Sequence, residues 1–156
     1  MCDYSLMSLP NRLAAEGEEL VVHRFSTGSI GFTSAADLNR KAEDRNCMSF
    51  WRRLKESVVS SDRPPTPALC VPPAARLLLR NVDAGLRRKY GLGSEEEVTF
   101  VQLSADPNTY RDAICCRSGM VLRLQELPVG QMAVVLDLAG DTREDQPLEK
   151  TSVLAG

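Results

Sequence analysis

The stretch from Asp112 to Leu138 constrains the fold more than any other part of the chain, because two turn signals divide it into three short apolar runs. Ser118-Gly119 separates the first two runs, and Pro128-Val129-Gly130 separates the second from the third. Glycine supplies the positive φ of tight turns, and proline fixes φ within them. Apolar and polar side chains alternate in the middle run, as in a half-buried strand. The stretch therefore predicts a three-stranded antiparallel meander.

Four more β-type runs precede this stretch. Glu19 to Phe25 and Ile30 to Thr33 flank a short glycine-containing turn, which predicts a hairpin. Ala75 to Val82 and Glu97 to Leu103 predict two further strands. Asp83 to Tyr90 lies between those strands and predicts a short helix, which the glycine after it would end with a left-handed cap.

Residues 35–59 have the pattern of an amphipathic helix. Cys47, Trp51, Leu54 and Val58 recur at steps of four, three and four residues and form one apolar stripe. We therefore expect an α+β fold in which seven or eight short, mainly antiparallel strands form a small barrel or strongly bent sheet, with this helix packed on it.

We expect residues 1–140 to form a single domain and residues 141–156 to form a flexible polar tail. Residues 60–73 contain five prolines, which remove backbone donors and favour extended geometry, so they predict an internal linker. Within this linker, Ala68 to Val71 predicts a short strand at the edge of the sheet.

Composition limits the kinds of molecule that the protein is expected to bind and the cellular compartment in which it is expected to occur. The formal net charge of -2 argues against nucleic-acid and membrane-surface binding. No apolar run approaches the ~20 residues that a membrane-spanning helix needs, and the acidic Asp3 does not fit a signal peptide. Five cysteines without an export signal predict reduced thiols and a cytoplasmic protein.

The opening Met1 to Leu6, together with Gly130-Gln131 and Val135-Leu136, resembles a group of small uncharacterised bacterial proteins. The resemblance covers the two ends of the chain and implies a bacterial origin, with no activity attached. Asp3-Tyr4 stands where the abasic-site-processing proteases and DNA-crosslinking proteins have Gly-Arg after their Met-Cys start, so the likeness to those enzymes stops at Cys2.

Cys2 and His23 are the candidate catalytic residues. If Met1 is removed, Cys2 combines a thiol with an α-amine of pKa about 7.7–8.0, which can act as a general base. His23 is the one histidine of the chain, and it would reach Cys2 if the first strand paired with Glu19 to Phe25. This pair would suit a hydrolase or amidotransferase-like enzyme. The alternative is that Cys2 is a small residue near the start of the first strand.

Two basic groups are candidates for binding nucleic acid or a protein partner. Arg52 and Arg53 lie in the predicted helix, and Arg87, Arg88 and Lys89 lie in the short helix before Gly91. For the predicted helix over residues 35–59, the sequence favours the alternative, a helix packed on the sheet with a solvated polar face. Residues 75–104 resemble the swapped-hairpin antitoxin and transition-state-regulator folds, which implies a DNA-binding regulator as an alternative.

We expect no metal and no cofactor. The chain has no Cys-x-x-Cys motif, and Cys115 and Cys116 are adjacent, so in a strand they would point to opposite faces. With few chemical motifs, the sequence favours a small non-enzymatic binding or regulatory module of the bacterial cytoplasm. Its partner would be a protein or a small molecule, and strand edges would allow a homo-oligomer.

Overall fold

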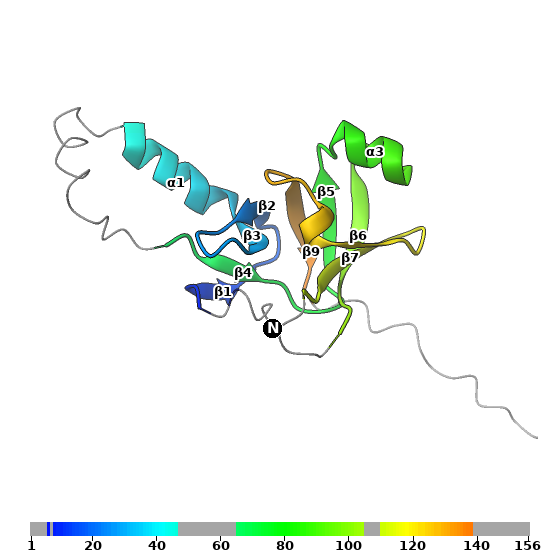
Figure 1. Ribbon diagram of the computed structural model, residues 1–156, viewed down its shortest axis with the longest axis horizontal. Coiled ribbons are helices and arrows are strands. Elements are labelled where there is room, and N and C mark those ends of the chain that lie inside the picture. The colour runs from blue at the N-terminus through cyan, green and yellow to red at the C-terminus, as the bar shows by residue number, and fades with distance from the viewer. Residues whose placement is uncertain (1–5, 7, 47–64, 105–109, 139–156) are drawn as a thin grey trace, which may run out of the picture.

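The computed structural model describes residues 6, 8–46, 65–104 and 110–138 of the chain. In these residues a single β-sheet carries helices α1 (Ala35–Asn46) and α3 (Ala84–Tyr90) and the 3-10 helix η2 (Leu124–Glu126) (Figure 1). The strands are β1 (Asn11–Leu13), β2 (Glu19–Arg24), β3 (Ile30–Ser34), β4 (Ala68–Cys70), β5 (Arg76–Arg80), β6 (Glu96–Gln102), β7 (Asp112–Cys116), β8 (Val121–Arg123) and β9 (Met132–Asp137).

The strands follow the order β1-β4-β3-β2-β9-β5-β6-β7-β8 across the sheet. β1 runs parallel to β4, and the other neighbouring pairs are antiparallel. The α+β class is therefore confirmed in outline. The predicted small barrel is wrong, because β1 and β8 stand at opposite ends of this order and the sheet is not closed. The predicted strand number is too low, since the described residues form nine strands.

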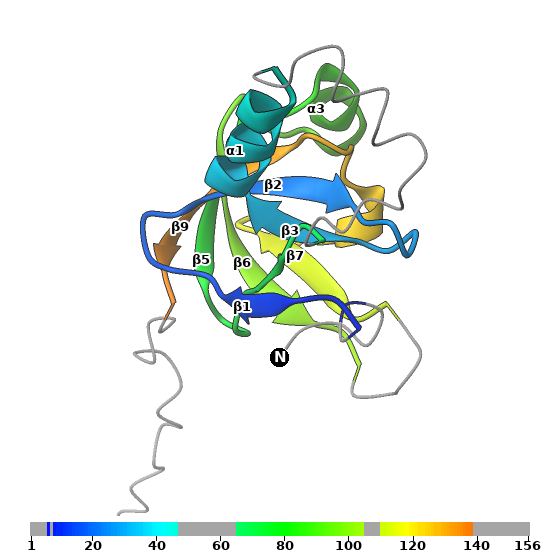
Figure 2. The same ribbon diagram turned by 90° about the vertical axis from the view of Figure 1, so that its left-hand side faces the viewer.

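The sheet bends around one main core. In Figure 2, β2 and β3 run at a steep angle to β5 and β6. The 3-10 helix η2, which follows β8, contacts both β3 and β7. It therefore links the half of the sheet that contains β1 to β4 with the half that contains β5 to β8. Alternate strand residues fill the space between the halves, among them Leu20, Val22, Phe32, Leu77, Leu79, Phe100, Ile114, Leu122 and Val135.

The meander predicted over Asp112 to Leu138 is only half correct. β7 and β8 form the predicted hairpin around Gly119, whose φ is 83°. β9, however, lies between β2 and β5 rather than beside β8. Leu124 and Leu127 are both buried in the core, and their spacing of three suits a 3-10 turn. The chain therefore coils into η2 after β8, and β9 then starts between β2 and β5.

The two described α-helices agree with the sequence. α1 contacts β2 and β3, as expected of a helix packed on the sheet, while residues 47–59 of the predicted helix lie outside the described residues. α3 is capped by Asp83, whose carboxylate accepts hydrogen bonds from the backbone N–H groups of Gly85 (2.7 Å) and Leu86 (3.3 Å). It ends at Gly91 in the predicted left-handed conformation. Neither described helix is long and apolar enough to cross a membrane.

β4 lies inside the proline-rich segment, as predicted, but it is not an edge strand. β1, which the sequence analysis did not predict, covers its outer side, and β3 covers its inner side. The single-domain assignment of residues 1–140 stays a prediction, and residues 60–64 and 141–156 lie outside the described residues.

Ion pairs connect the strands on the solvent face of the sheet. Arg76 lies 3.4 Å from Glu97 and 3.5 Å from Asp137, which links β5 to β6 and β9. Arg117, in the turn after β7, lies 2.7 Å from the other oxygen of Glu97. Exposed pairs of this kind contribute ~0–1 kcal/mol each. They make this face compatible with water rather than providing the main stabilisation.

Candidate functional site

The structure tests the predicted catalytic pair only through His23, because Cys2 lies outside the described residues. His23 is half-buried on β2, and its ring meets that of Phe25 edge to face with 5.0 Å between the centroids. In the described part of the chain, β2 pairs with β3 and β9, and β1 pairs with β4. Cys2 as a nucleophile activated by His23 stays a prediction.

Leu6 nevertheless lies against the cross-strand partner of His23. Gly31 is the cross-strand partner of His23, and Leu6 lies directly on Gly31, within 2.6 Å of the point where a Cβ atom would stand. Leu6 also belongs to a small second core with Leu9, Phe25 and Ala68. This small core fastens Leu6 and Leu9 to the sheet beside β3 and β4.

The described cysteines differ in oxidation state. Cys115 and Cys116 are free thiols, and burial raises the pKa of Cys116 above its ordinary value. Cys70, in contrast, is disulfide-bonded. The prediction of reduced thiols is therefore wrong for Cys70, which packs against the small core of Leu6.

The predicted basic group of α3 is exposed. Arg87, Arg88 and Lys89 follow one another at ~100° around the helix axis, so they surround its solvent side instead of sharing one face. The Lys89 ammonium lies 4.6 Å from the ring centroid of Tyr90, and a hydrogen bond with Tyr90 raises the pKa of Lys89. Tyr90 in turn donates to Glu126 of η2 at 3.4 Å.

Nucleic-acid or partner binding by these three residues stays a prediction, as does the swapped-hairpin resemblance of residues 75–104. The strand, helix, strand order of that segment is confirmed, with β5 and β6 paired directly in an antiparallel register. Arg52 and Arg53, the other predicted basic residues, lie outside the described residues.

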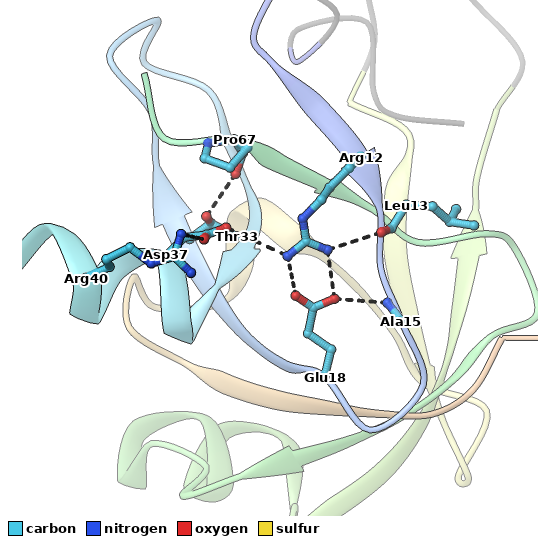
Figure 3. A network of polar contacts seen from close by, with 8 residues as sticks. All are labelled: Arg12, Leu13, Ala15, Glu18, Thr33, Asp37, Arg40 and Pro67. Carbon is cyan, nitrogen blue, oxygen red and sulfur yellow. Dashed lines mark hydrogen bonds and ion pairs between the residues drawn. The ribbon is translucent and has the colours of Figure 1, made fainter. Parts of the chain in front are cut away.

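The best-defined polar constellation lies beside β1, where Arg12 reaches over to Glu18 (Figure 3). The guanidinium group donates two hydrogen bonds to the Glu18 carboxylate, one of them 3.0 Å long. The same carboxylate accepts the backbone N–H of Ala15 at 2.9 Å. Asp37, in the first turn of α1, lies 3.7 Å from Arg12, and Arg40 lies 3.6 Å from Asp37. We call Arg12, Glu18 and Asp37 the Arg12 clasp.

The electrostatics of the clasp favour the charged forms. The hydrogen bonds from Arg12 lower the pKa of Glu18, and the hydrogen bond to Glu18 raises the pKa of Arg12. The Glu18 side chain is 15% exposed and that of Arg12 is 45% exposed, so the pair is only partly screened by water. The clasp ties β1 both to the turn before β2 and to α1.

The clasp holds a strand that has one neighbour among the described residues. Asn11, Arg12 and Leu13 of β1 are in register with β4. The Pro10 carbonyl accepts from β4 at 2.8 Å, and the Ala14 N–H donates to β4 at 3.0 Å. These two bonds mark the ends of the parallel ladder.

The ladder determines which backbone groups of β1 face away from β4. In a parallel pair, alternate residues direct both of their backbone groups toward the same neighbour. Arg12 therefore faces β4, and the N–H and C=O groups of Asn11 and Leu13 face the opposite side. We call these four groups the β1 edge. The Leu13 carbonyl also accepts a 3.3 Å hydrogen bond from Arg12, and the Leu13 side chain is 60% exposed.

Sequence reasoning missed the β1 edge, because three residues are too few for a periodic signal. The sequence did carry one clue: Arg12 and Glu18 are the oppositely charged residues on either side of the short Ala-Ala-Glu-Gly turn. No described group of three or more His, Cys, Asp or Glu side chains is arranged to hold a metal ion. Comparison of the chain with protein-family models, curated proteins and solved structures finds no match.

Proposed function

We propose that the chain is a small non-enzymatic binding module, and that it binds an extended polypeptide segment as an added strand at the β1 edge. The observation that carries this proposal is the outward orientation of the backbone groups of Asn11 and Leu13. Such groups give an added strand its affinity, and neighbouring side chains give it selectivity. The exposed Leu13 side chain offers an apolar contact beside them.

The Arg12 clasp supports this function by holding β1 in place before a partner arrives. A short edge strand on its own loses conformational entropy when it binds, and that loss weakens affinity. Three charged groups and the Ala15 N–H fix the turn after β1 here. Because the strand is already ordered, binding does not carry the entropic cost of ordering it.

The opposite edge of the sheet, β8, is less suited to the same role. The chain turns into η2 directly after Arg123, and the Arg123 N–H donates to the Glu126 carboxylate at 2.8 Å. Covered and shortened edges of this kind protect sheets against unwanted pairing. Both edge strands have three residues and an exposed apolar side chain, so the difference between them is that the chain turns into η2 at the end of β8. The comparison of the two edges favours β1 as the site for an added strand.

Binding at β1 should be weak and reversible. A three-residue edge buries much less than the ~1,200 Å² of total surface that marks the lower limit of stable protein interfaces. Weak binding suits regulated contact with an extended segment of another protein. A second copy of this chain, paired through Leu13 of each copy, is a distinguishable outcome of the same test.

A proline substitution at Leu13 tests the proposal. Proline removes the N–H group that faces away from β4, and it leaves the β4-facing groups of Arg12 and Ala14 in place. Leu13→Thr is the matched control, because it removes the apolar side chain and keeps the N–H group. The probe is a phage-displayed library of random dodecapeptides selected against the unmodified protein, with affinities then measured by fluorescence anisotropy.

We expect the selected peptides to lose about tenfold or more of their affinity with Leu13→Pro and to keep most of it with Leu13→Thr. Sedimentation velocity on the protein alone identifies a second copy as the added strand if dimers form with the unmodified chain and not with Leu13→Pro. Peptides that bind Leu13→Pro as well as the unmodified protein, or a library that yields no binder, would overturn the proposal.

A further inference from the structure

The solvent face of the sheet is largely apolar where β6, β7 and β8 lie side by side. Val98, Phe100, Ile114 and Leu122 of these strands belong to the core, so the residues between them point to the solvent face. A solvated antiparallel face normally presents polar side chains at such positions. Here most of them are apolar, and we call this set the β6–β8 face: Thr99, Val101, Leu103, Ala113, Cys115 and Val121.

The strand register brings these side chains together. Cys115 pairs with Thr99 on one side and with Val121 on the other. Leu103 continues β6, because its N–H donates to the carbonyl of Arg111 at 2.9 Å. Val121 is 43% exposed and Leu103 is 46% exposed, at opposite corners of the face. Exposed apolar side chains that gather in this way mark a surface that binds another molecule.

Two arginines border the face. Arg123 pairs with Ala113 on β8, and Arg111 lies opposite Leu103. Neither guanidinium group forms an ion pair within the described ranges of the chain. The Nε atom of Arg111 is buried and has no hydrogen-bond acceptor among the described residues. A buried donor without an acceptor costs free energy, and a ligand that supplies the acceptor recovers it.

The charge of this border indicates an acidic ligand. Arg117, a third arginine nearby, already lies 2.7 Å from Glu97, so the positive charge left over belongs to Arg111 and Arg123. Guanidinium groups bind carboxylates through parallel hydrogen bonds. Nucleic acid fits this surface less well, because two arginines neutralise few phosphates and the β6–β8 face contains no aromatic side chain on which a base could stack.

The dimensions of the face match a helix. Val121 is level with Thr99, four residues before Leu103, and β8 is two strands away from β6. The two exposed corners are therefore about 17 Å apart, which is the length of about three helical turns. We propose that the β6–β8 face binds an acidic amphipathic helix of another protein, whose apolar side covers Leu103 and Val121 and whose carboxylates pair with Arg111 and Arg123. This proposal does not depend on binding at the β1 edge.

A designed peptide tests the proposal on the full chain. The probe is a fluorescein-labelled helical peptide of about four turns, with leucines along one side and glutamates and alanines on the other. One control peptide has lysines in place of the glutamates, and a second has serines in place of the leucines. We expect the glutamate–leucine peptide to bind about tenfold more tightly than either control in fluorescence anisotropy, and to lose affinity as salt is added.

Matched variants locate the binding surface. Arg123→Gln should weaken binding about threefold, whereas Arg24→Gln, which removes an exposed arginine from the end of β2, should not. Val121→Ser should weaken binding, and Val129→Ser, at another exposed valine, should not. The bound peptide should slow the alkylation of Cys115 by iodoacetamide and leave the amide resonances of β1 unchanged.

Three results would overturn the proposal. The first is a glutamate–leucine peptide that does not bind, or that binds no better than the lysine peptide. The second is unchanged affinity with both Arg123→Gln and Val121→Ser. The third is a single-stranded oligonucleotide that binds more tightly than the peptide and is weakened by Arg123→Gln, which would assign the surface to nucleic acid instead.

Discussion

Leu6 occupies the space that a side chain on Gly31 would need, with its Cδ1 atom 2.6 Å from the position of a Cβ atom there. Gly31 does not have a positive φ, so its contribution is space rather than backbone freedom. Phe25 lies 3.4 Å from the same point and closes the other side. The absence of one methyl group on β3 therefore lets Leu6 pack on the sheet.

We predict that Gly31→Ala lowers the free energy of unfolding by about 1–3 kcal/mol, because the added methyl group overlaps Leu6. Leu6→Ala alone should cost about 2–5 kcal/mol through the lost burial of a leucine side chain. The double variant should cost less than the sum of the two, because the overlap disappears with Leu6. Urea unfolding of the four proteins measures this coupling. Strictly additive costs would show that Leu6 does not lie on Gly31.

Glu18→Gln tests the Arg12 clasp. We expect a loss of about 1 kcal/mol of unfolding free energy near neutral pH, because a charged pair with 45% exposure of Arg12 is partly screened. Glu16→Gln is the matched control: it lies in the same turn, and its amide oxygen can still accept the 3.3 Å hydrogen bond from Leu138. The control should change stability much less.

The contribution of the Arg12–Glu18 pair to the free energy of unfolding should decrease as the pH falls. The pKa of Glu18 is lowered in the folded protein, so its contribution is present above the unfolded value of about 4.3 and is lost as the pH falls through the folded value. The stability difference between the unmodified protein and Glu18→Gln should therefore be constant near neutral pH and shrink in acid. A difference that grows in acid would contradict the clasp.

The adjacent thiols of β7 should react at different rates. Cys115 is half-buried, whereas Cys116 is 3% exposed and its pKa is raised by burial. Iodoacetamide reacts with the thiolate, so Cys115 should be alkylated well before Cys116 in the folded protein at mildly alkaline pH. Denaturant should make the two rates similar. Equal rates in the folded protein would contradict the placement of Cys116 in the core.

Several elements of the fold could be predicted because their signals are local. The β2–β3 hairpin follows from two β-type runs around a glycine turn, and α3 follows from Asp83 and Gly91 at its two ends. The position of β9 could not be predicted in this way. Its neighbours β2 and β5 are distant in sequence, and the choice between them and β8 depends on how Leu124 and Leu127 fill the core.

The candidate site was less predictable than the fold. β1 is three residues long and all three are exposed, so neither periodicity nor hydrophobicity identifies it. Its pairing with β4 depends on a segment more than fifty residues away, which the sequence predicts as a strand at the edge of the sheet with no strand outside it. The sequence instead predicted Cys2 and His23 as site residues, because a sequence identifies reactive side chains. It does not show which backbone groups face outward from a sheet.

Amide hydrogen exchange, followed by NMR at single residues, tests the central claim most directly. Our account predicts that the Leu13 N–H exchanges rapidly in the free protein, whereas the Ala14 N–H, which donates to Cys70 at 3.0 Å, is protected. A peptide selected from the library should slow exchange at Leu13 and leave Ala14 unchanged. If Leu13 is already as protected as Ala14 in the free protein, the β1 edge is covered and the account is wrong.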